Sequence, residues 1–309
     1  RNGLRPCRYL VTTDGLLVMA SETGIIDIPV ENIRYKWRIE PGRMFLLDTE
    51  EGRIVEDDEI KAELASRRDY GAWLRDYKIE MDELPEPSKI PNGEPETLVD
   101  RQKVFGYSEE ELRMILEPMA VTGVEAVGSM GNDSPLAVLS DQGPLLFNYF
   151  KQLFAQVSNP PLDAIREELV TSVETFIGAE GNLFDETPEL CHQLKVKEPI
   201  LTNRDLEKIR GIGAGRLRAK TISTLFQPEN GPGSLKSAMD HLCEQTSEAI
   251  REGFSILILS DRGVNSKNAP IPSLLATAGV HHHLVREGSR TKFGLVVESG
   301  EPREVAHFA

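Results

Sequence analysis

The first 60 residues alternate short apolar runs with turn residues. β-Branched, aromatic and other apolar side chains occupy the runs at 9–12, 16–20, 24–28 and 44–48, and an Asp14-Gly15 turn separates the first two. Runs of this length that are divided by tight turns predict strands joined as hairpins. The beginning of the chain is therefore expected to form an antiparallel sheet.

The period of the pattern changes after residue 56. Residues 57–68 place Ile60 and Leu64 on one face of a predicted helix whose other face is charged, and residues 70–77 continue it or form a neighbouring helix. The next stretch, 82–99, is polar and is interrupted at Pro85, Pro87, Pro91, Gly93 and Pro95. Such a stretch is typical of a linker, so we expect a domain boundary there.

Beyond this linker the pattern indicates an α/β domain. Residues 108–119 predict a helix with Ser108 as N-cap, Glu111 as its capping-box partner and Pro118 at its end. Further helices are expected at 145–156, 235–253 and 274–286, and apolar strands at 254–259 and 292–297. Because a helix that leads into a doubly buried strand indicates a parallel sheet, we expect an open parallel sheet or a partial barrel over residues 100–309.

The amino-acid composition excludes several classes of partner and site. The chain has 309 residues, with 35 Lys and Arg against 50 Asp and Glu, and a formal net charge of −15. This acidic balance argues against nucleic acid as a partner. No apolar run approaches the roughly 18 residues that a membrane-spanning helix needs, so no membrane partner is expected. The cysteines, Cys7, Cys191 and Cys243, form neither a disulfide framework nor a thiolate metal or iron–sulfur site, which favours a reducing compartment.

Both ends of the sequence have the character of internal segments. The sequence opens at Arg1 without a methionine or a signal-type segment, and it stops in the apolar stretch 305–309 without a polar tail. We therefore expect a piece of a longer protein.

Three loops are candidates for a functional site. Residues 128–135 hold two glycines and an Asp-Ser-Pro turn, and residues 157–163 hold a proline pair that fixes the direction of Asn159. Asp261 and Arg262 directly follow the apolar strand 254–259, at the edge where parallel sheets place their sites. Each loop has a structural alternative, because the first two can be plain tight connections and the third can cap or pair with its neighbours.

Other residues of chemical interest favour structural roles. His281, His282 and His283 are consecutive in a predicted helix and point about 100° apart, so they cannot converge on one ion and no metal site is expected. Cys7 has no base near it in the sequence that would make it a nucleophile. The glycines of residues 211–215 lack the preceding strand and the spacing of a dinucleotide loop, so a turn between helices is the simpler interpretation.

The ordered series of segments resembles the large (alpha) subunit of glutamate synthase. The segments that carry this resemblance are RNGLRPCRY (1–9), VMASETGIIDI (18–28), EPGRMFLLDTEEGRI (40–54), GYSEEEL (106–112), EPMAVTGVEAVGSMGNDSPLAVLS (117–140), NYFKQLFAQVSNPPLDAIREELV (148–170), EPILTN (198–203), ILILSDRGV (256–264) and the stretch PIPSLLATAGVHHHLVREGSRTKFGLVVESGEPREVAHFA (270–309). They cover nearly the whole chain in the order of the family, which is more specific than any single motif.

The resemblance implies a role for each part of the chain. Residues 1–84 would be the β-rich C-terminal part of a class II glutamine amidotransferase domain of the N-terminal-nucleophile type, whose catalytic cysteine lies upstream. Residues 85–99 would be a linker, and residues 100–309 the central domain, an α/β unit that resembles a rudimentary TIM-like barrel. FMN and an iron–sulfur cluster are expected in the complete protein and not in this segment. The chain would then hold no catalytic residue and be inactive by itself.

The family makes glutamate from glutamine-derived ammonia and 2-oxoglutarate with a reduced flavin, and ammonia passes between the two sites in an internal tunnel that must exclude water. By resemblance, the tunnel candidates are Met119, Thr122, Ser129, Met130, Asn132, Asp133, Ser158 and Asn159. The domain-interface candidates are Asp261, Arg262, His281, His282 and His283. The family has GSMGDDTP and AQVTNPP where this chain has Asn132, Ser134 and Ser158, which removes one carboxylate and two methyl groups.

Two other functions stay open from the sequence. One is a non-catalytic interaction or regulatory module that keeps the fold without the catalytic neighbours. The other is an independent α/β hydrolase or lyase that would use Asp261, Arg262 and His282, and only the strand-end position favours it. A glutamate synthase would have the flanking amidotransferase and FMN-binding domains as partners, and a small electron-donating subunit or ferredoxin. The sequence does not decide between NADPH, NADH and ferredoxin as donor. We expect a cytoplasmic location, with the plastid stroma as the alternative.

Overall fold

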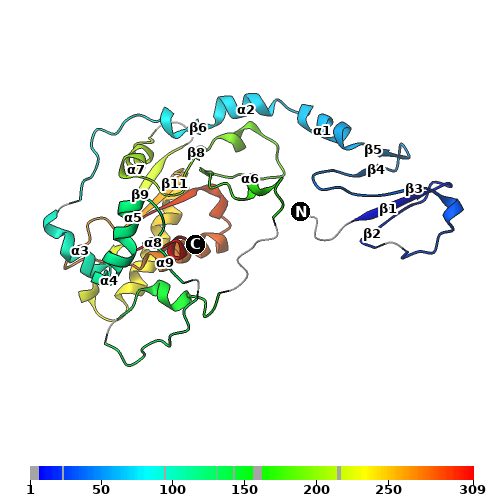
Figure 1. Cartoon of the computed structure of the whole chain (residues 1–309). Coiled ribbons are helices and arrows are strands. Elements are labelled where there is room, and N and C mark those ends of the chain that lie inside the picture. Colours follow the sequence, from blue (N-terminus) through cyan, green and yellow to red (C-terminus); the bar gives the residue numbers. More distant parts are fainter. Residues whose placement is uncertain are drawn as a thin grey trace. The chain divides into compact units, whose positions relative to one another are not determined.

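The computed structural model describes residues 7–22, 24–93, 95–129, 131–141, 143–155, 162–213 and 217–309. The chain divides into two compact units, Arg1–Ala72 with Asn159–Ser172, and Trp73–Ser158 with Val173–Ala309. Each unit has β-sheet of its own (Figure 1). Helix α2 (Tyr70–Tyr77) spans the division between them.

The first unit is built on a three-stranded antiparallel sheet with the strand order β2-β1-β3. Its elements are β1 (Arg8–Thr12), β2 (Leu17–Ala20), β3 (Ile33–Arg38), the hairpin of β4 (Leu46–Asp48) and β5 (Arg53–Val55), and the helices α1 (Asp57–Ser66) and α6 (Glu167–Val170). The predicted antiparallel sheet and the helix after residue 56 are confirmed.

One strand of this unit was predicted in the wrong place. Residues 24–28 form no strand, and the third strand of the sheet is β3 instead. The reason lies in the pattern, since Ile25 and Ile26 are adjacent and cannot share one face of a strand, whereas Ile33, Tyr35 and Trp37 of β3 alternate with basic residues. The strand pairing shows the same result, because β3 pairs with β1 and places Trp37 opposite Tyr9.

The second unit contains a three-stranded parallel sheet with the order β13-β11-β9. Its strands are β9 (Ala219–Ser223), β11 (Ile256–Ser260) and β13 (Gly294–Glu298), and the helices between them are α8 (Ser234–Arg251) and α9 (Ser273–Arg286). In chain order these three strands are neighbours, so the winding is β-α-β-α-β (Figure 1). The series from α8 to β13 was predicted from the sequence, whereas β9 was not. The described strands form an open sheet, and a TIM-like barrel remains a prediction.

Smaller elements complete the second unit. The other strands are β6 (Ile79–Glu80), β7 (Thr175–Ile177) and β8 (Leu194–Val196), which form the sheet β6-β8-β7, and the short antiparallel pair β10 (Leu225–Phe226) and β12 (Ala269–Pro270). The further helices are α3 (Leu98–Val104), α7 (Asn203–Arg210) and α10 (Val305–Phe308). Short 3₁₀ segments lie at Val30–Asn32 in the first unit, and at Met81–Glu83, Pro95–Thr97, Leu146–Phe150, Pro188–Cys191, Pro228–Asn230 and Arg290–Lys292 in the second.

The central strand β11 joins the two apolar cores of this unit. Its side chains alternate between faces, so Leu257 and Leu259 pack with α8 and α9, while Ile256 and Ile258 pack with α7, β7 and β8. All four are fully buried. This two-sided burial explains why the strand is a continuous apolar run rather than an alternating one.

Two predicted helices differ from the structure. The helix that Ser108 caps comprises α4 (Glu109–Glu111), a π-turn (Leu112–Leu116) and α5 (Glu117–Thr122), so it continues past Pro118 to a left-handed Gly123. A π-turn just before a proline relieves the clash of its ring with the preceding turn. The helix predicted at 145–156 forms only the 3₁₀ segment Leu146–Phe150 within the described residues. Tyr149, Phe150, Leu153 and Phe154 are exposed, and a helix without a surface on which to pack its apolar face gains little stability.

Candidate functional site

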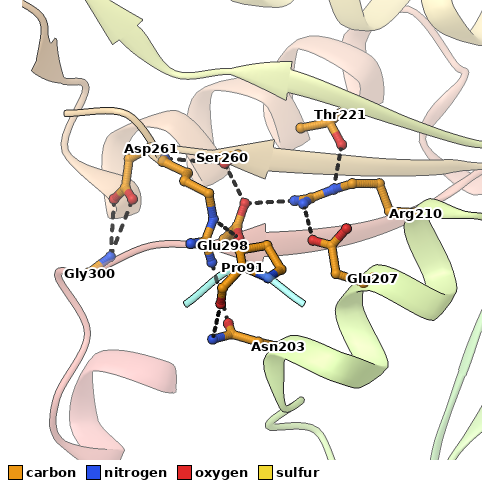
Figure 2. Close-up of polar contacts among 10 residues, drawn as sticks. Pro91, Asn203, Glu207, Arg210, Thr221, Ser260, Asp261, Glu298 and Gly300 are labelled. Atoms are coloured by element: carbon orange, nitrogen blue, oxygen red, sulfur yellow. Dashed lines mark hydrogen bonds and ion pairs between the residues drawn. The ribbon is translucent and has the colours of Figure 1, made fainter. Parts of the chain in front are cut away.

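The carboxyl ends of the three parallel strands bring charged side chains together. Register places Glu298 beside Ser260, and both side chains lie on the sheet face that α7 covers. The Glu298 Oε2 atom accepts hydrogen bonds from Ser260 Oγ at 2.5 Å and Arg210 Nη2 at 2.7 Å, and its Oε1 atom accepts one from Arg262 Nε at 2.7 Å (Figure 2). Glu298 is therefore the centre of this polar cluster.

Two arginines enclose the Glu298 carboxylate. Burial raises the pKa of Glu298, but hydrogen bonds from Ser260 and Arg262 and the charges of Arg210 and Arg262 outweigh burial and hold the pKa below its usual value. Arg210 also donates to Thr221 Oγ1 at 3.1 Å and to Glu207 Oε1 at 2.5 Å (Figure 2). Both guanidinium groups are thus engaged by the chain's own carboxylates, which favours a structural role for them over binding of an external anion.

Asp261 has a different environment at the same sheet edge. Its Oδ2 atom accepts a hydrogen bond from Ser299 Oγ at 2.6 Å. Its carboxylate also accepts one from the Gly300 N–H at 3.2 Å (Figure 2). Burial is the largest influence and raises the pKa of Asp261 to about 6, helped by the charges of Glu298 and Glu301 and opposed by the two hydrogen bonds. Asp261 therefore anchors the turn that follows β13.

The turn after β13 also holds the start of α9. Glu301 is buried, and its Oε2 atom accepts hydrogen bonds from the Ser273 N–H and the Ser273 hydroxyl, both at 2.6 Å. A carboxylate at a helix N-terminus satisfies an otherwise free N–H group and interacts favourably with the helix dipole. The predicted candidates Asp261 and Arg262 therefore meet in one strand-end region with Glu298 and Glu301.

The three histidines do not join this region. His281 accepts from Arg290 Nε at 3.0 Å through its Nδ1 atom, whereas the His283 Nε2 atom lies 2.9 Å from Ser247 Oγ. His281 and His283 therefore contact different partners, and the rings of His281 and His282 meet edge to face with centroids 5.1 Å apart. Among the residues that the structure describes, no group of His, Cys, Asp and Glu is arranged to hold a metal ion.

The hydrolase alternative finds no support in this arrangement. His282 lies nine residues into α9, about 13 Å along the helix from the end that Glu301 caps. The Ser247 hydroxyl donates to Glu287 Oε2 at 2.7 Å, so its single proton is not available to His283, and His283 must be the donor in their contact. A histidine that donates to a serine does not act as its general base.

The tunnel candidates that the structure describes belong to a separate part of the second unit. Met119 and Thr122 lie on α5, and Thr122 Oγ1 donates to the Pro118 carbonyl at 2.7 Å. Ser129 Oγ donates to the Gly131 carbonyl at 2.8 Å, and Asn132 Oδ1 accepts from the Ser134 N–H at 3.1 Å. Asp133 follows in the same loop. Met130, Ser158 and Asn159 lie outside the described residues.

The loop around Gly131 packs directly on the segment 152–155. The Asn132 N–H donates to the Gln152 carbonyl at 3.0 Å. A Cβ atom on Gly131 would lie 2.6 Å from Phe154 Cα and 2.8 Å from Phe154 C, so only glycine permits this approach. The structure thus brings together two segments that the sequence analysis selected separately, the loop 128–135 and the stretch that leads to residue 158.

Apolar side chains are exposed along both of these segments. They are Val121, Val124, Val127, Leu136, Val138, Leu139, Tyr149, Phe150, Leu153 and Phe154. A groove of about 740 Å³ also runs beside β13, lined by Phe147, Ile177, Leu206 and Val296 among others. Apolar surface of this kind is typical of an interface with further protein.

Two family comparisons match successive parts of this chain. The profile of the class-II glutamine amidotransferases matches residues 1–73, and the profile of the glutamate synthase central domain matches residues 100–309, which is more than half of the chain. The chain belongs to the glutamate synthase family. The resemblance to the large subunit is thereby confirmed, together with an amidotransferase remnant followed by a central domain.

Similar glutamate synthases come from bacteria and fungi. The glutamate synthase [NADPH] large chain of Bacillus subtilis is 45% identical over 309 residues, which is 100% of this chain and 20% of the relative. The glutamate synthase [NADH] of Schizosaccharomyces pombe is 40% identical over 99% of this chain and 15% of the relative, and the ferredoxin-dependent glutamate synthase 2 of Synechocystis is 38% identical over 100% and 20%. This chain therefore spans about a fifth or less of the length of these synthases.

Sequence reasoning missed Glu298, Arg210 and Asn203 in this glutamate synthase segment. Glu298 directly follows the predicted strand 292–297 just as Ser260 follows 254–259, so the strand-end argument that selected Asp261 also applies to it. Arg210 and Asn203 lie at the two ends of α7 and carry no comparable signal. The described residues include no helix long and apolar enough to cross a membrane.

Proposed function

We propose that this chain is the part of a glutamate synthase that links the glutaminase site to the flavin site. The complete polypeptide would make glutamate from the amide nitrogen of glutamine and from 2-oxoglutarate, and a reduced flavin would supply the electrons. The order of the two family matches on one chain carries this proposal, because an amidotransferase remnant directly precedes a synthase central domain. FMN and an iron–sulfur cluster would be held by other parts of that polypeptide.

The same proposal assigns an ammonia passage to the 119–135 and 152–159 segments. Ammonia that escaped to water would mostly be protonated and lost, so a passage needs close-packed backbone and apolar side chains that exclude water. The contact of Gly131 with Phe154 and the exposed valines beside it support this role once further protein covers them. Met119, Thr122, Ser129, Met130, Asn132, Asp133, Ser158 and Asn159 are the proposed lining residues.

Domain boundaries and interfaces are part of the proposal. The amidotransferase remnant would end near residue 84, and the central domain would begin near residue 100. Asp261, Arg262 and the histidines 281–283 are proposed to face neighbouring domains. The relatives include NADPH, NADH and ferredoxin-dependent synthases by name, so the donor of this protein is not assigned, and a small subunit or ferredoxin would deliver the electrons. We place the protein in the cytoplasm or the plastid stroma.

Adding one methyl group at Gly131 tests the proposed ammonia passage. We expect Gly131→Ala, in the full-length synthase, to lower the glutamate formed per glutamine hydrolysed about fivefold, because displacements of order 1 Å in a positioning segment cost up to about 10²-fold. The added Cβ atom would meet the backbone of Phe154 and Ala155, which cannot yield as a flexible side chain does. The measurement is the ratio of glutamate to glutamine consumed, with released ammonia assayed in parallel.

Gly128→Ala is the matched control, because a Cβ atom at Gly128 has nothing within 4 Å. An unchanged ratio in Gly131→Ala would remove this loop from the passage. A full-length protein that forms no glutamate from glutamine would instead favour the non-catalytic interaction or regulatory module.

A further inference from the structure

The stretch between the two family matches is attached to the second unit. The amidotransferase match ends at residue 73 and the central-domain match begins at residue 100. Within this stretch β6 pairs in parallel with β8 through Ile79 opposite Leu194, and the Ile79 N–H donates to the Gln193 carbonyl at 3.0 Å. The predicted linker, residues 85–99, therefore begins only a few residues after a strand of this unit.

Glu86 makes the strongest attachment of this stretch. Its Oε2 atom lies 2.7 Å from both Arg204 Nε and Arg204 Nη2, and its Oε1 atom lies 3.0 Å from Lys208 Nζ. The Lys208 side chain is only 7% exposed, so Glu86 neutralises an ammonium group that is largely removed from water. Hydrogen bonds from Lys208 and Arg204 lower the pKa of Glu86. One carboxylate thus links the stretch to both turns of α7.

A second attachment leads to the polar cluster at the strand ends. The Pro91 carbonyl accepts from Asn203 Nδ2 at 3.4 Å, and Asn203 Oδ1 accepts from Arg262 Nη2 at 3.3 Å. Arg262 in turn donates to Glu298, so a continuous series of contacts connects Pro91 to the end of β13 (Figure 2). These two bonds, at 3.4 and 3.3 Å, are longer than the contacts of Glu86 and are therefore the weaker attachment.

We propose that residues 79–93 form a strap, clamped onto α7 by Glu86 and Asn203, that fixes the course of the chain between the amidotransferase and central parts and so keeps ammonia transfer coupled to glutamine hydrolysis. The coupling half of this inference rests on the proposed function. An unattached linker of about 25 residues would spread its ends over roughly 25–30 Å. A clamped strap removes most of this freedom. Glu86 and Asn203 are positioning residues and touch no reacting atom.

The clamp can be measured without any enzyme assay. Lys89 is exposed and lies between the two attachments, so trypsin cleavage of the Lys89–Ile90 bond reports how often the strap lifts from α7. In the full-length protein, Glu86→Gln should raise the rate of this cleavage about fivefold, the ratio that corresponds to loss of an ion pair of about 1 kcal/mol. Asn203→Ala should raise it about twofold and leave the Thr202–Asp205 capping box of α7 intact.

Asp240→Asn is the matched control for the clamp. It removes an exposed ion pair with Lys236 on α8, 2.6 Å long and far in sequence from the strap, and should leave the rate at Lys89 unchanged. Cleavage at Lys89 in Glu86→Gln that is no faster than in the wild type and in Asp240→Asn would overturn the clamp.

The coupling half is tested in the same full-length variant. Glu86→Gln should lower the glutamate formed per glutamine hydrolysed about twofold or more and leave glutamate formation from added ammonia at the wild-type rate. A purely structural role would lower both rates together. Faster cleavage with an unchanged ratio would overturn the coupling and leave the clamp in place. A wild-type protein that makes no glutamate would overturn the proposed function and the coupling with it, while the cleavage rates would still decide the clamp.

Discussion

Replacing Ile258 by alanine should lower the free energy of unfolding of the second unit by about 3–4 kcal/mol, within the range found for large-to-small substitutions in cores. Ile258 is fully buried at the centre of β11, between neighbouring strands on both sides and against the side chains of α7, β7 and β8. Its removal leaves a cavity in a layer with little room to collapse, because the strand is held on both edges. Urea denaturation of the whole chain, followed by the transition of the second unit, measures this loss.

An exposed isoleucine of the same unit provides the comparison. Ile200 is 63% exposed, so Ile200→Ala should change the free energy of unfolding by less than about 0.5 kcal/mol, as surface substitutions usually do. A loss of less than about 1 kcal/mol in Ile258→Ala would mean that β11 is not the centre of the core.

Replacing Asp261 by asparagine should make the second unit less sensitive to pH between 4 and 7. Burial, with the charges of Glu298 and Glu301, raises the pKa of Asp261 to about 6 in the folded protein, whereas an unfolded aspartate titrates near about 3.9. Between these values the folded chain holds a proton that the unfolded chain has released. The contribution of Asp261 to the free energy of unfolding is therefore fully present below about pH 4. It is lost as the pH rises through about 6.

The Asp261→Asn variant lacks the titrating carboxyl group and so separates its contribution to the free energy of unfolding from that of other groups. The difference of about two pH units corresponds to about 2–3 kcal/mol, so the free energy of unfolding of Asp261→Asn should gain that amount relative to the wild type from pH 4 to pH 7. Asparagine keeps an acceptor for Ser299 Oγ and the Gly300 N–H, which preserves the turn after β13. Chemical denaturation at several pH values checks this. A difference between the two proteins that stays constant with pH would contradict the buried, proton-holding state of Asp261.

The two long helices of the second unit and two strands of its parallel sheet could be predicted from local patterns. The helices α8 and α9 and the strands β11 and β13 begin and end within about two residues of their predicted limits, the usual uncertainty of an element boundary. Their apolar side chains are buried inside this chain, so periodicity and packing agree. The helix predicted at 145–156 has the same periodicity but exposes Leu153 and Phe154, and the described part of it is only a 3₁₀ segment. A segment with this apolar periodicity forms a stable helix only where its apolar face packs against other residues.

The sequence by itself determined the antiparallel sheet at its start, the order of α8, β11, α9 and β13, the acidic balance and membership of the glutamate synthase family, because these depend on patterns that are local or collinear along the chain. It also placed Asp261 and Arg262 at a strand end, since a strand and the loop after it are adjacent in the sequence. Only the tertiary structure decided that Glu298 lies between Arg210 and Arg262, that Glu86 neutralises Lys208, and that Gly131 touches the backbone of Phe154. The physical reason is that strand register and helix packing set these contacts, so the partner of each side chain cannot be identified from the residues beside it in the sequence.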